Sequence, residues 1–433
     1  MPGMDLLDDA RAMADDLADL RHRLHRRPEI GLRLPRTQEA VLESLKGLGL
    51  EINTGIDLSS VTAVLRGGAA PAGAERPVVL LRADMDALPV HEEVSLPYRS
   101  TVDGVMHACG HDLHTTMLVG AARLLAARRE QLPGDVILMF QPGEEGFDGA
   151  QKMIEEGVLE AAGRRPDAAF AIHVISNMTD RGHVATRPGP VMAASDGLFV
   201  TVRGAGGHGS SPHLSRDPVP ATCEMVVALQ TAINRQVDAF APVVLTVGSI
   251  HAGTRRNIIP ETAEFEATVR TFDREIRGHV RELTQRVCRG IADAHGLEVE
   301  LRYVEEYPVT VNDRSSVDLA LGVTREMLGE DRSSLLEKPV TGTEDFSRVI
   351  AEIPGALLFL GACLDDRDPA TAPSNHSPRA GFDDRVLAEG AAIYAELAVS
   401  RLKAGAGAMR AEPTPETVEI PEEAGSAPPV AIP

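Results

Sequence analysis

The chain has 433 residues, of which 43% are hydrophobic, and a formal net charge of -21 at pH 7. This length exceeds the size at which one hydrophobic core stops growing, so we expect two domains. The negative charge argues against nucleic acid or an anionic membrane as a partner, because both are bound through clustered basic side chains.

The sequence also bears on the compartment. Residues 1–20 carry six aspartates and no apolar run, which is not the pattern of a secretory signal. The sequence contains no run of about 18 apolar residues, which is the length that would predict a membrane-spanning helix. The four cysteines lack paired spacing, which argues against a disulfide framework. We therefore expect a reducing, cytoplasmic location.

Helix-like and strand-like segments alternate along residues 1–190. Apolar residues at helical spacing predict a first helix that ends near Pro28. Further helices are expected at about 112–129 and 150–156, and short aliphatic runs predict strands at 78–81, 136–140 and 168–174. This alternation is typical of a mainly parallel α/β sheet covered by helices on both faces.

The pattern changes after Pro190. Strands are predicted at 198–202, 243–250, 264–271 and 298–303, and helices at 217–238 and 273–295. The order β-α-β-β-α-β is that of a ferredoxin-like α+β unit. We therefore expect residues 191–305 to form a lid domain inserted into the first domain, and this lid is a candidate surface for homo-oligomers.

The α/β character then returns. Helices are predicted at 316–328 and 384–402 and a strand at 356–361, so residues 306–403 should complete the domain that residues 1–190 begin. Residues 404–433 contain six prolines, one arginine and five glutamates. This composition predicts a disordered tail.

The most informative motif is His-Ala-Cys-Gly-His-Asp at residues 107–112. Thiolate and imidazole are the ligands that zinc and similar divalent ions prefer. Cys109 and His111 flank one glycine, so both side chains can point into one cavity. A second motif, Gln-Pro-Gly-Glu-Glu-Gly at 141–146, places two carboxylates in one turn. Two buried carboxylates repel unless a cation lies nearby, so we predict that this turn contributes to the same metal site.

Other interpretations stay open when each motif is taken alone. A buried thiol beside a helix-capping histidine would explain residues 107–112, and paired glutamates are common in solvated turns. His173 lies near the end of an apolar strand, where a histidine satisfied by core packing is the more frequent case. His208 lies in the glycine-rich segment 204–212, which is either a mobile hairpin or an arm that reaches the other domain. His376 has no periodic context.

Seven motifs in this order resemble those of the metal-dependent amidohydrolases that include hippurate hydrolase, N-acyl-amino-acid amidohydrolases and auxin-conjugate hydrolases. This group belongs to the wider carboxypeptidase and aminoacylase superfamily. The motifs lie at residues 82–89, 107–112, 141–146, 206–208, 257–260, 342–346 and 376–378, and the resemblance covers residues 10–402. Their order makes the set specific, although no single motif is.

The resemblance implies roles for individual residues. The metal ligands would be Cys109, His111, Glu145, His173 and His376, and they would bind two divalent ions, zinc, manganese or similar. Glu144 would be the general base. Asp86 resembles the aspartate that orients metal ligands, although Asp84 could be aligned there instead. His208 resembles the histidine that stabilises the oxyanion. Asn257 and Glu344 would contact the substrate, with Asn257 at its carboxylate.

The activity implied is hydrolysis of the amide bond of an N-acyl amino acid to a carboxylic acid and a free amino acid. One alternative is a dipeptidase or carboxypeptidase of the same superfamily. Another is a non-catalytic small-molecule binding protein with a structural metal. Structural metal sites use four protein ligands per ion and leave no free base beside them, so the Glu144 and Glu145 pair favours the enzyme.

Overall fold

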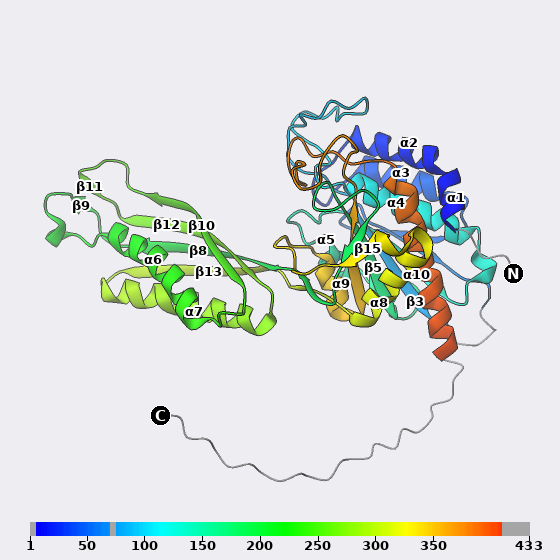
Figure 1. Ribbon diagram of the computed structural model, residues 1–433. Coiled ribbons are helices and arrows are strands. Elements are labelled where there is room, and N and C mark those ends of the chain that lie inside the picture. The colour runs from blue at the N-terminus through cyan, green and yellow to red at the C-terminus, as the bar shows by residue number, and fades with distance from the viewer. Residues whose placement is uncertain (1–5, 70–74, 409–433) are drawn as a thin grey trace, which may run out of the picture.

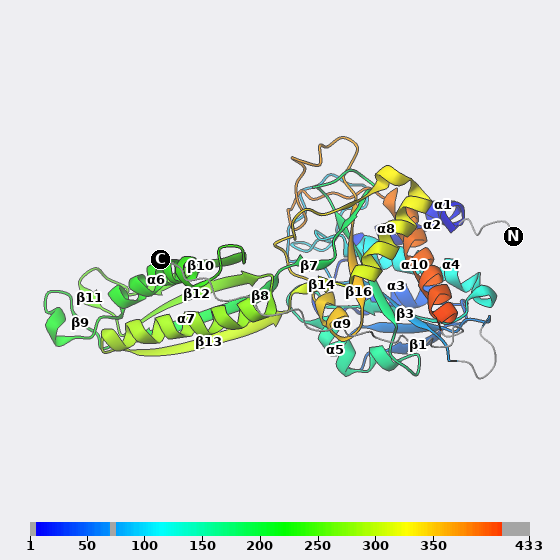
Figure 2. The same cartoon turned by 60° about the horizontal axis from the view of Figure 1, so that its bottom comes forward.

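The computed structural model describes residues 6–69 and 75–408. Figures 1 and 2 show two units joined by narrow connections. The larger unit is built on an eight-stranded sheet. The smaller unit, residues 194–307, is built on a four-stranded sheet.

The sheet of the larger unit has the strand order β1-β2-β4-β3-β5-β16-β6-β15. Its strands are β1 (Glu51–Thr54), β2 (Val61–Leu65), β3 (Val78–Asp84), β4 (Asp135–Gln141), β5 (Ala168–Ile175), β6 (Val184–Thr186), β15 (Ser333–Leu335) and β16 (Gly355–Gly361). The central strands β4, β3, β5 and β16 are parallel. The predicted mainly parallel sheet is therefore confirmed at its centre, whereas β1 and β2 add an antiparallel edge.

Helices cover both faces of this sheet. One face carries α1 (Leu6–Ala12), α2 (Ala14–His25), α3 (Pro35–Leu45), α4 (His111–Ala126), α8 (Arg314–Leu328) and α10 (Val386–Ala408), and the other carries α5 (Gly149–Glu155) and α9 (Phe346–Glu352). Successive strand residues point to opposite faces, so Leu81 packs in the first core and Leu80 in the second. Both faces are buried, which explains the uninterrupted apolar runs of the central strands.

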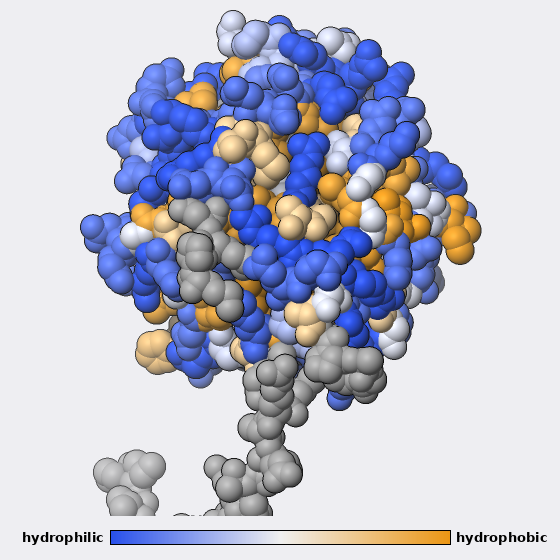
Figure 3. Space-filling view, turned by 90° about the vertical axis from the view of Figure 1, so that its right-hand side faces the viewer, coloured by the Kyte–Doolittle hydropathy of each residue, from blue (hydrophilic) through white to orange (hydrophobic). Residues whose placement is uncertain are grey.

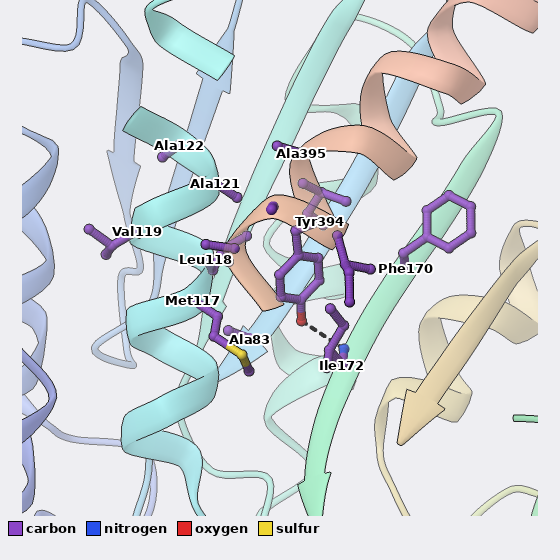
Figure 4. Close-up of a cluster of buried hydrophobic side chains, with 14 of the residues drawn as sticks. Ala83, Met117, Leu118, Val119, Ala121, Ala122, Phe170, Ile172, Tyr394 and Ala395 are labelled. Carbon is purple, nitrogen blue, oxygen red and sulfur yellow. Dashed lines mark hydrogen bonds between the residues drawn. The ribbon is translucent and has the colours of Figure 1, made fainter. Parts of the chain in front are cut away.

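Figure 4 shows part of the first core, where side chains of α4, α10 and β5 meet. Tyr394 of α10 places its ring in this core, and its hydroxyl accepts a hydrogen bond of 2.7 Å from the Ile172 amide. The same hydroxyl donates to the Arg82 carbonyl at 2.7 Å. A buried tyrosine hydroxyl needs such partners, and here they tie α10 to strands β5 and β3.

The smaller unit has the predicted β-α-β-β-α-β order. Its main elements are β8 (Ala194–Arg203), α6 (Pro218–Gln236), β10 (Val243–Ala252), β12 (Thr262–Thr271), α7 (Arg274–Ala294) and β13 (Glu298–Tyr307). The strand order β10-β12-β8-β13 is antiparallel throughout, and the unit has its own hydrophobic core. Short strands β9 (Gly207–His208) and β11 (Ile258–Ile259) pair at the end far from the larger unit (Figures 1 and 2).

Smaller elements connect the two units and the main helices. Strands β7 (Gly189–Met192) and β14 (Thr310–Asn312) pair where the chain passes between the units. Short 3-10 helices lie at Arg129–Gln131, Val158–Glu160, Pro212–Leu214 and Glu330–Arg332.

Two sequence expectations need correction at the termini. The first predicted helix is two helices, because α1 ends at Ala12 and α2 begins at Ala14. Helix α10 continues to Ala408, into the segment that was expected to be tail from Ala404. Residues 404–408 alternate alanine, the strongest helix former, with glycine, a weak one. The rest of the predicted tail, 409–433, lies outside the described residues.

One face of the larger unit is mostly polar. Hydrophilic residues cover most of the face of the larger unit that Figure 3 shows. Among the helices of the described ranges, none is long and apolar enough to cross a membrane.

Candidate metal centre

Segments far apart in the sequence meet at the carboxyl ends of the central strands, which is where open α/β sheets place ligands. Asp84 ends β3, the turn with Glu144 and Glu145 follows β4, and His173 lies in β5. Cys109 and His111 lie at the start of α4. The loop that carries His376 joins them because the Asn375 side-chain amide donates to the carbonyls of Cys109, at 3.1 Å, and Val174, at 2.9 Å.

The five predicted metal ligands lie together. The Cys109 Sγ atom is 3.5 Å from His173 Nε2 and 3.2 Å from His376 Nε2. The Glu145 Oε1 atom is 3.1 Å from His376 Nε2 and 4.0 Å from His111 Nε2. Two ligands of one tetrahedral zinc ion lie about 3.5 Å apart, given Zn–S and Zn–N bonds of about 2.3 and 2.0 Å. The spacing of the thiol and imidazoles therefore suits a shared ion.

The ligands form two groups that share Cys109. One group is Cys109, His111 and His173, and the other is Cys109, Glu145 and His376, with the ligand atoms of each group within 4.8 Å of one another. Both ring nitrogens of His111 are buried without a hydrogen-bond partner, whereas Glu145 Oε1 lies 3.1 Å from His376 Nε2. Buried polar atoms normally have partners, so this donor set fits two divalent ions, which these residues would hold.

The electrostatics of the site favour a bound cation. Burial and the neighbouring His114 lower the pKa of His173 well below its usual value, which keeps its ring in the neutral form that binds metals. Hydrogen bonds to Cys109 and Glu145 raise the pKa of His376 to about 10. Cys109 and Glu145 therefore attract positive charge at this position, and a metal cation could take the place of the proton.

Two aspartates lie next to the predicted ligands. The Asp86 carboxylate accepts hydrogen bonds from the amides of Glu144, at 3.0 Å, and Glu145, at 3.1 Å, and its Oδ1 atom lies 3.5 Å from His111 Nδ1. Asp84 Oδ2 lies 3.8 Å from His111 Nε2. Both aspartates therefore approach His111, and Asp86 also fixes the backbone of the glutamate turn.

The other histidines of the first motif occupy supporting positions. The Nε2 atom of His114 accepts from the Val174 amide at 2.7 Å, so its Nδ1 carries the proton and donates to Asp84 Oδ1 at 2.6 Å. Both of its ring nitrogens are thus engaged. His107 is 1% exposed with neither ring nitrogen hydrogen-bonded, and burial lowers its pKa to about 3. His107 is therefore a neutral, buried side chain and not part of either ligand group.

Glu144 lies beside the two ligand groups that share Cys109 and belongs to neither, although its carboxylate also forms a group of possible ligands with His111 and Glu145 and another with Glu344 and Asp345. Its side chain lines a cavity of about 640 Å³ together with Cys109, Glu145, His173 and His376. Burial, followed by the charges of Glu344 and Glu145, raises its pKa well above the usual value. Within the described part of the chain, hydrogen bonds engage its backbone but not its carboxylate. A poised, uncommitted carboxylate is what a general base requires.

Arg82 of β3 binds a buried cluster of three carboxyl groups, Asp84, Glu344 and Asp345, and offsets part of their charge. Its guanidinium donates to Asp84 Oδ2 at 2.7 Å, to Glu344 Oε1 at 2.8 Å and to Asp345 Oδ1 at 2.7 Å. Arg82 is 2% exposed. Sequence reasoning did not single out Arg82, although an arginine in a fully buried strand is a signal, because such a residue is almost never buried unpaired.

This cluster also decides where Glu344 lies. Glu344 is 1% exposed, and its Oε1 atom also accepts from the Phe346 amide at 3.0 Å. Gly342 and Thr343 line the cavity, but Glu344 does not. Contact of Glu344 with substrate therefore stays a prediction. In the structure Glu344 binds Arg82 and the Phe346 amide and does not line the cavity.

Comparison with known proteins decides the family. Residues 80–400 match the family described as Peptidase family M20/M25/M40. The chain belongs to this family.

Individual members are similar over nearly the whole chain. Thermostable carboxypeptidase 1 of Saccharolobus solfataricus is 37% identical over 91% of this chain and 97% of its own length. Hippurate hydrolase of Campylobacter jejuni is 36% identical over 92% of this chain and 100% of its own length. The crystal structure of a dinuclear metal-binding M20 peptidase from Bacillus subtilis superposes with a TM-score of 0.76 at 32% identity, covering 91% of this chain and 99% of that one.

These relatives confirm the predicted family, the α/β fold and the class of metal-dependent hydrolase. The predicted pair of ions agrees with the dinuclear M20 relative and with the two ligand groups. The assignment of each ligand and of Glu144 rests on the geometry described above and stays a prediction.

His208 and Asn257 lie elsewhere in this M20 chain. They are neighbours, because the Gly209 amide donates to the Asn257 carbonyl at 2.9 Å and β9 pairs with β11. Both lie at the far end of the smaller unit (Figure 1), and neither lines the cavity. The structure thus brings these two residues together but not to the metal ligands.

The near end of the smaller unit does reach the cavity. Ser195, Arg270 and Tyr307 line it. Arg270, the one arginine among the lining residues that the structure describes, donates to the Ser195 hydroxyl. Sequence reasoning missed Arg270, and its signal is weak because it is one of several charged residues along β12.

Proposed function

We propose that the protein hydrolyses the amide bond of N-acyl amino acids, using two divalent ions held by Cys109, His111, Glu145, His173 and His376. The observation that carries this proposal is the free carboxylate of Glu144 on the cavity wall, next to the ligand groups. A closed structural metal site leaves no such group. The geometry therefore favours catalysis over the alternative of a metal-stabilised binding protein.

The residues divide the work of the reaction. Divalent ions would supply Lewis acidity that polarises the amide carbonyl and makes water acidic. Glu144 takes the proton from the attacking water and returns it to the leaving amine. Asp86 keeps Glu144 in place, because its carboxylate accepts a hydrogen bond from the backbone amide of Glu144. The products are a carboxylic acid and a free amino acid.

The cavity suits a substrate with an apolar acyl group and one carboxylate. Ile175, Met178, Met192 and Phe359 supply apolar wall. Arg270 supplies a guanidinium, which is suited to binding a carboxylate through paired hydrogen bonds. The name of the Campylobacter relative, hippurate hydrolase, supports an N-acyl amino acid of this kind.

A carboxypeptidase activity is the second candidate. It is favoured by the name of the Saccharolobus relative, and Arg270 would serve a peptide carboxylate equally well. The two candidates differ at the other end of the substrate, because a dipeptide carries a free amine that an acyl group lacks. Turnover of paired N-acyl amino acids and dipeptides with the same carboxyl-terminal residue separates them.

We also propose that the smaller unit acts as a lid and joins subunits. When the lid brings them to a metal centre, His208 would stabilise the oxyanion and Asn257 would bind the substrate carboxylate. Strand β10 is an edge strand, with Val244 43% and Ile250 50% exposed, and such edges readily pair with another chain. The four free cysteines support the proposed cytoplasmic location.

The decisive experiment replaces Glu144 by glutamine and measures hippurate and N-acetyl-methionine hydrolysis with manganese or zinc. Loss of a positioned proton-transfer group should lower kcat by about two to four orders of magnitude, at unchanged metal content. Glu155→Gln, an exposed glutamate of α5, is the matched control and should behave as the parent. Retention of more than about a tenth of the activity in Glu144→Gln contradicts the proposed base.

A further inference from the structure

The hydroxyl of Tyr307 contacts the backbone of the turn that carries Glu144. Tyr307 is the last residue of β13 and is 7% exposed. Its Oη atom donates to the Glu144 carbonyl at 2.6 Å and accepts from the Gly146 amide at 2.9 Å. One side chain from the smaller unit thus bridges the peptide groups on both sides of Glu145.

The turn has two backbone hydrogen bonds of its own, from the Gly146 amide to the Glu144 carbonyl at 2.8 Å and from the Gly149 amide to the Gly143 carbonyl at 3.0 Å, but residues 143–148 belong to no helix or strand. Gly143 and Gly146 have φ angles of 74° and 85°, in the left-handed region that favours glycine. Asp148, which is not glycine, has a φ of 55°, a conformation that costs free energy unless the surroundings fix it. The turn is therefore placed by its neighbours and not by a helix or strand of its own.

Two neighbours hold the turn from opposite sides of its peptide groups. Asp86, from the larger unit, accepts the amides of Glu144 and Glu145. Tyr307, from the smaller unit, binds the Glu144 carbonyl and the Gly146 amide. Asp86 thus binds the peptide groups before and after Glu144 through their amides, and Tyr307 binds the second of these through its carbonyl, so the two side chains together set the direction of the Cα–Cβ bond of Glu144.

We propose that Tyr307 is a positioning residue for Glu144: its hydroxyl fixes the peptide group after Glu144 and so aims the carboxylate into the cavity. This inference rests on the proposed role of Glu144 as the base. Tyr307 acts through the turn, although it also lines the cavity. A misplacement of about 1 Å in a catalytic group lowers the rate by about 100-fold, so a contact of this kind matters for kcat.

The place of Tyr307 in the chain connects the base to the junction between the two units. The pairing of β13 with β8 shifts register between Glu305 and Tyr307. Arg348 of α9 donates to the Glu306 carbonyl at 2.6 Å and pairs with Asp148 at 2.8 Å. The end of β13 is therefore tied to the start of the turn by Tyr307 and to its end by Arg348, so the geometry of the turn depends on how this strand enters the larger unit.

The test compares two tyrosine-to-phenylalanine variants of β13 in the full-length, metal-loaded enzyme. Tyr307→Phe removes the hydroxyl and keeps the ring. Tyr303→Phe removes a partly buried hydrogen bond of 2.8 Å, to Asp196, that stays within the smaller unit. We expect Tyr307→Phe to lower kcat by about 10- to 100-fold, with KM and metal content within about twofold of the parent. Tyr303→Phe should leave all three unchanged.

A double-mutant cycle separates positioning from general loss of structure. If Tyr307 acts through Glu144, adding Tyr307→Phe to Glu144→Gln should not lower the residual kcat further, whereas independent effects would multiply. Multiplying effects, an equal fall in Tyr303→Phe, loss of metal or fold in Tyr307→Phe, or a parental kcat in that variant each overturn the inference. Activity retained by Glu144→Gln overturns the proposed base itself, so the two failures are distinguishable.

Discussion

Replacing Cys109 by alanine should lower metal content more than replacing any other proposed ligand. Cys109 is the only residue that the two ligand groups have in common among the described residues, with Sγ 3.5 Å from His173 Nε2 and 3.2 Å from His376 Nε2. His173 and His376 each belong to one of these two groups. Losing Cys109 removes a ligand from both ions, whereas losing either histidine removes a ligand from one.

The size of the effect follows from ligand loss. Removing a partner that only supports a ligand weakens metal binding by about 10- to 100-fold, and removing a direct ligand should exceed that. If the parent retains about two ions per chain after dialysis, as in two-metal hydrolases, His173→Ala and His376→Ala should each retain about one. Cys109→Ala should retain close to none.

The assay is elemental analysis of the dialysed chains, with Cys223→Ala as the control, because Cys223 is an exposed free cysteine of α6. Circular dichroism on the same samples shows whether each variant is folded. Metal content in Cys109→Ala equal to that of the parent would refute the shared thiolate ligand and assign Cys109 to packing. Equal losses in all three variants would refute the division into two groups.

Two further predictions concern the support of the site and the lid. Arg82→Met leaves the buried carboxylate cluster without its cation and should lower the free energy of unfolding in urea by about 3–5 kcal/mol. Arg165→Met, whose ion pairs are exposed, is the control and should leave the free energy of unfolding unchanged. A loss below about 1 kcal/mol in Arg82→Met, the level of a surface pair, would contradict the role of the cluster. His208→Ala should lower kcat at unchanged metal content and unchanged affinity for a carboxylate product, and a raised KM at constant kcat would instead assign His208 to substrate binding.

The sequence predicts the elements whose own pattern is strong. The run at 78–81 is buried on both faces as part of β3, and helix α7 shows clear spacing of apolar residues. Strand β1 was missed because all four of its residues are exposed, so no apolar pattern marks it, and its place depends on antiparallel pairing with β2. Helix α3 was missed although Pro35 stands at its first turn, a common helix-start position.

In the site, too, residues with a distinctive local pattern are predicted, and residues whose role depends on distant contacts are not. Residues whose chemistry is unusual, such as a thiol between two imidazoles, are found from the sequence because few other roles suit them. Tyr307 was not found, because its partner Glu144 lies 163 residues earlier and a tyrosine after an acidic run has many ordinary roles. Arg270 was missed for a related reason. Its importance comes from the cavity that it enters, and that cavity exists only when β12 and the turn after β4 are brought together.

The charge of the cavity wall links metal binding to substrate binding. Five carboxylates line the cavity, those of Glu144, Glu145, Asp148, Glu305 and Glu306, against one arginine, Arg270. Asp148 is paired with Arg348 and Glu305 with Arg281 outside the lining, so the remaining carboxylates still outnumber the lining arginine. An anionic substrate is repelled by such a wall. Two divalent ions add about four positive charges and invert the local balance. The same charge would oppose the burial and the neighbouring carboxylates that raise the pKa of Glu144, so one event prepares both the substrate site and the ionised base.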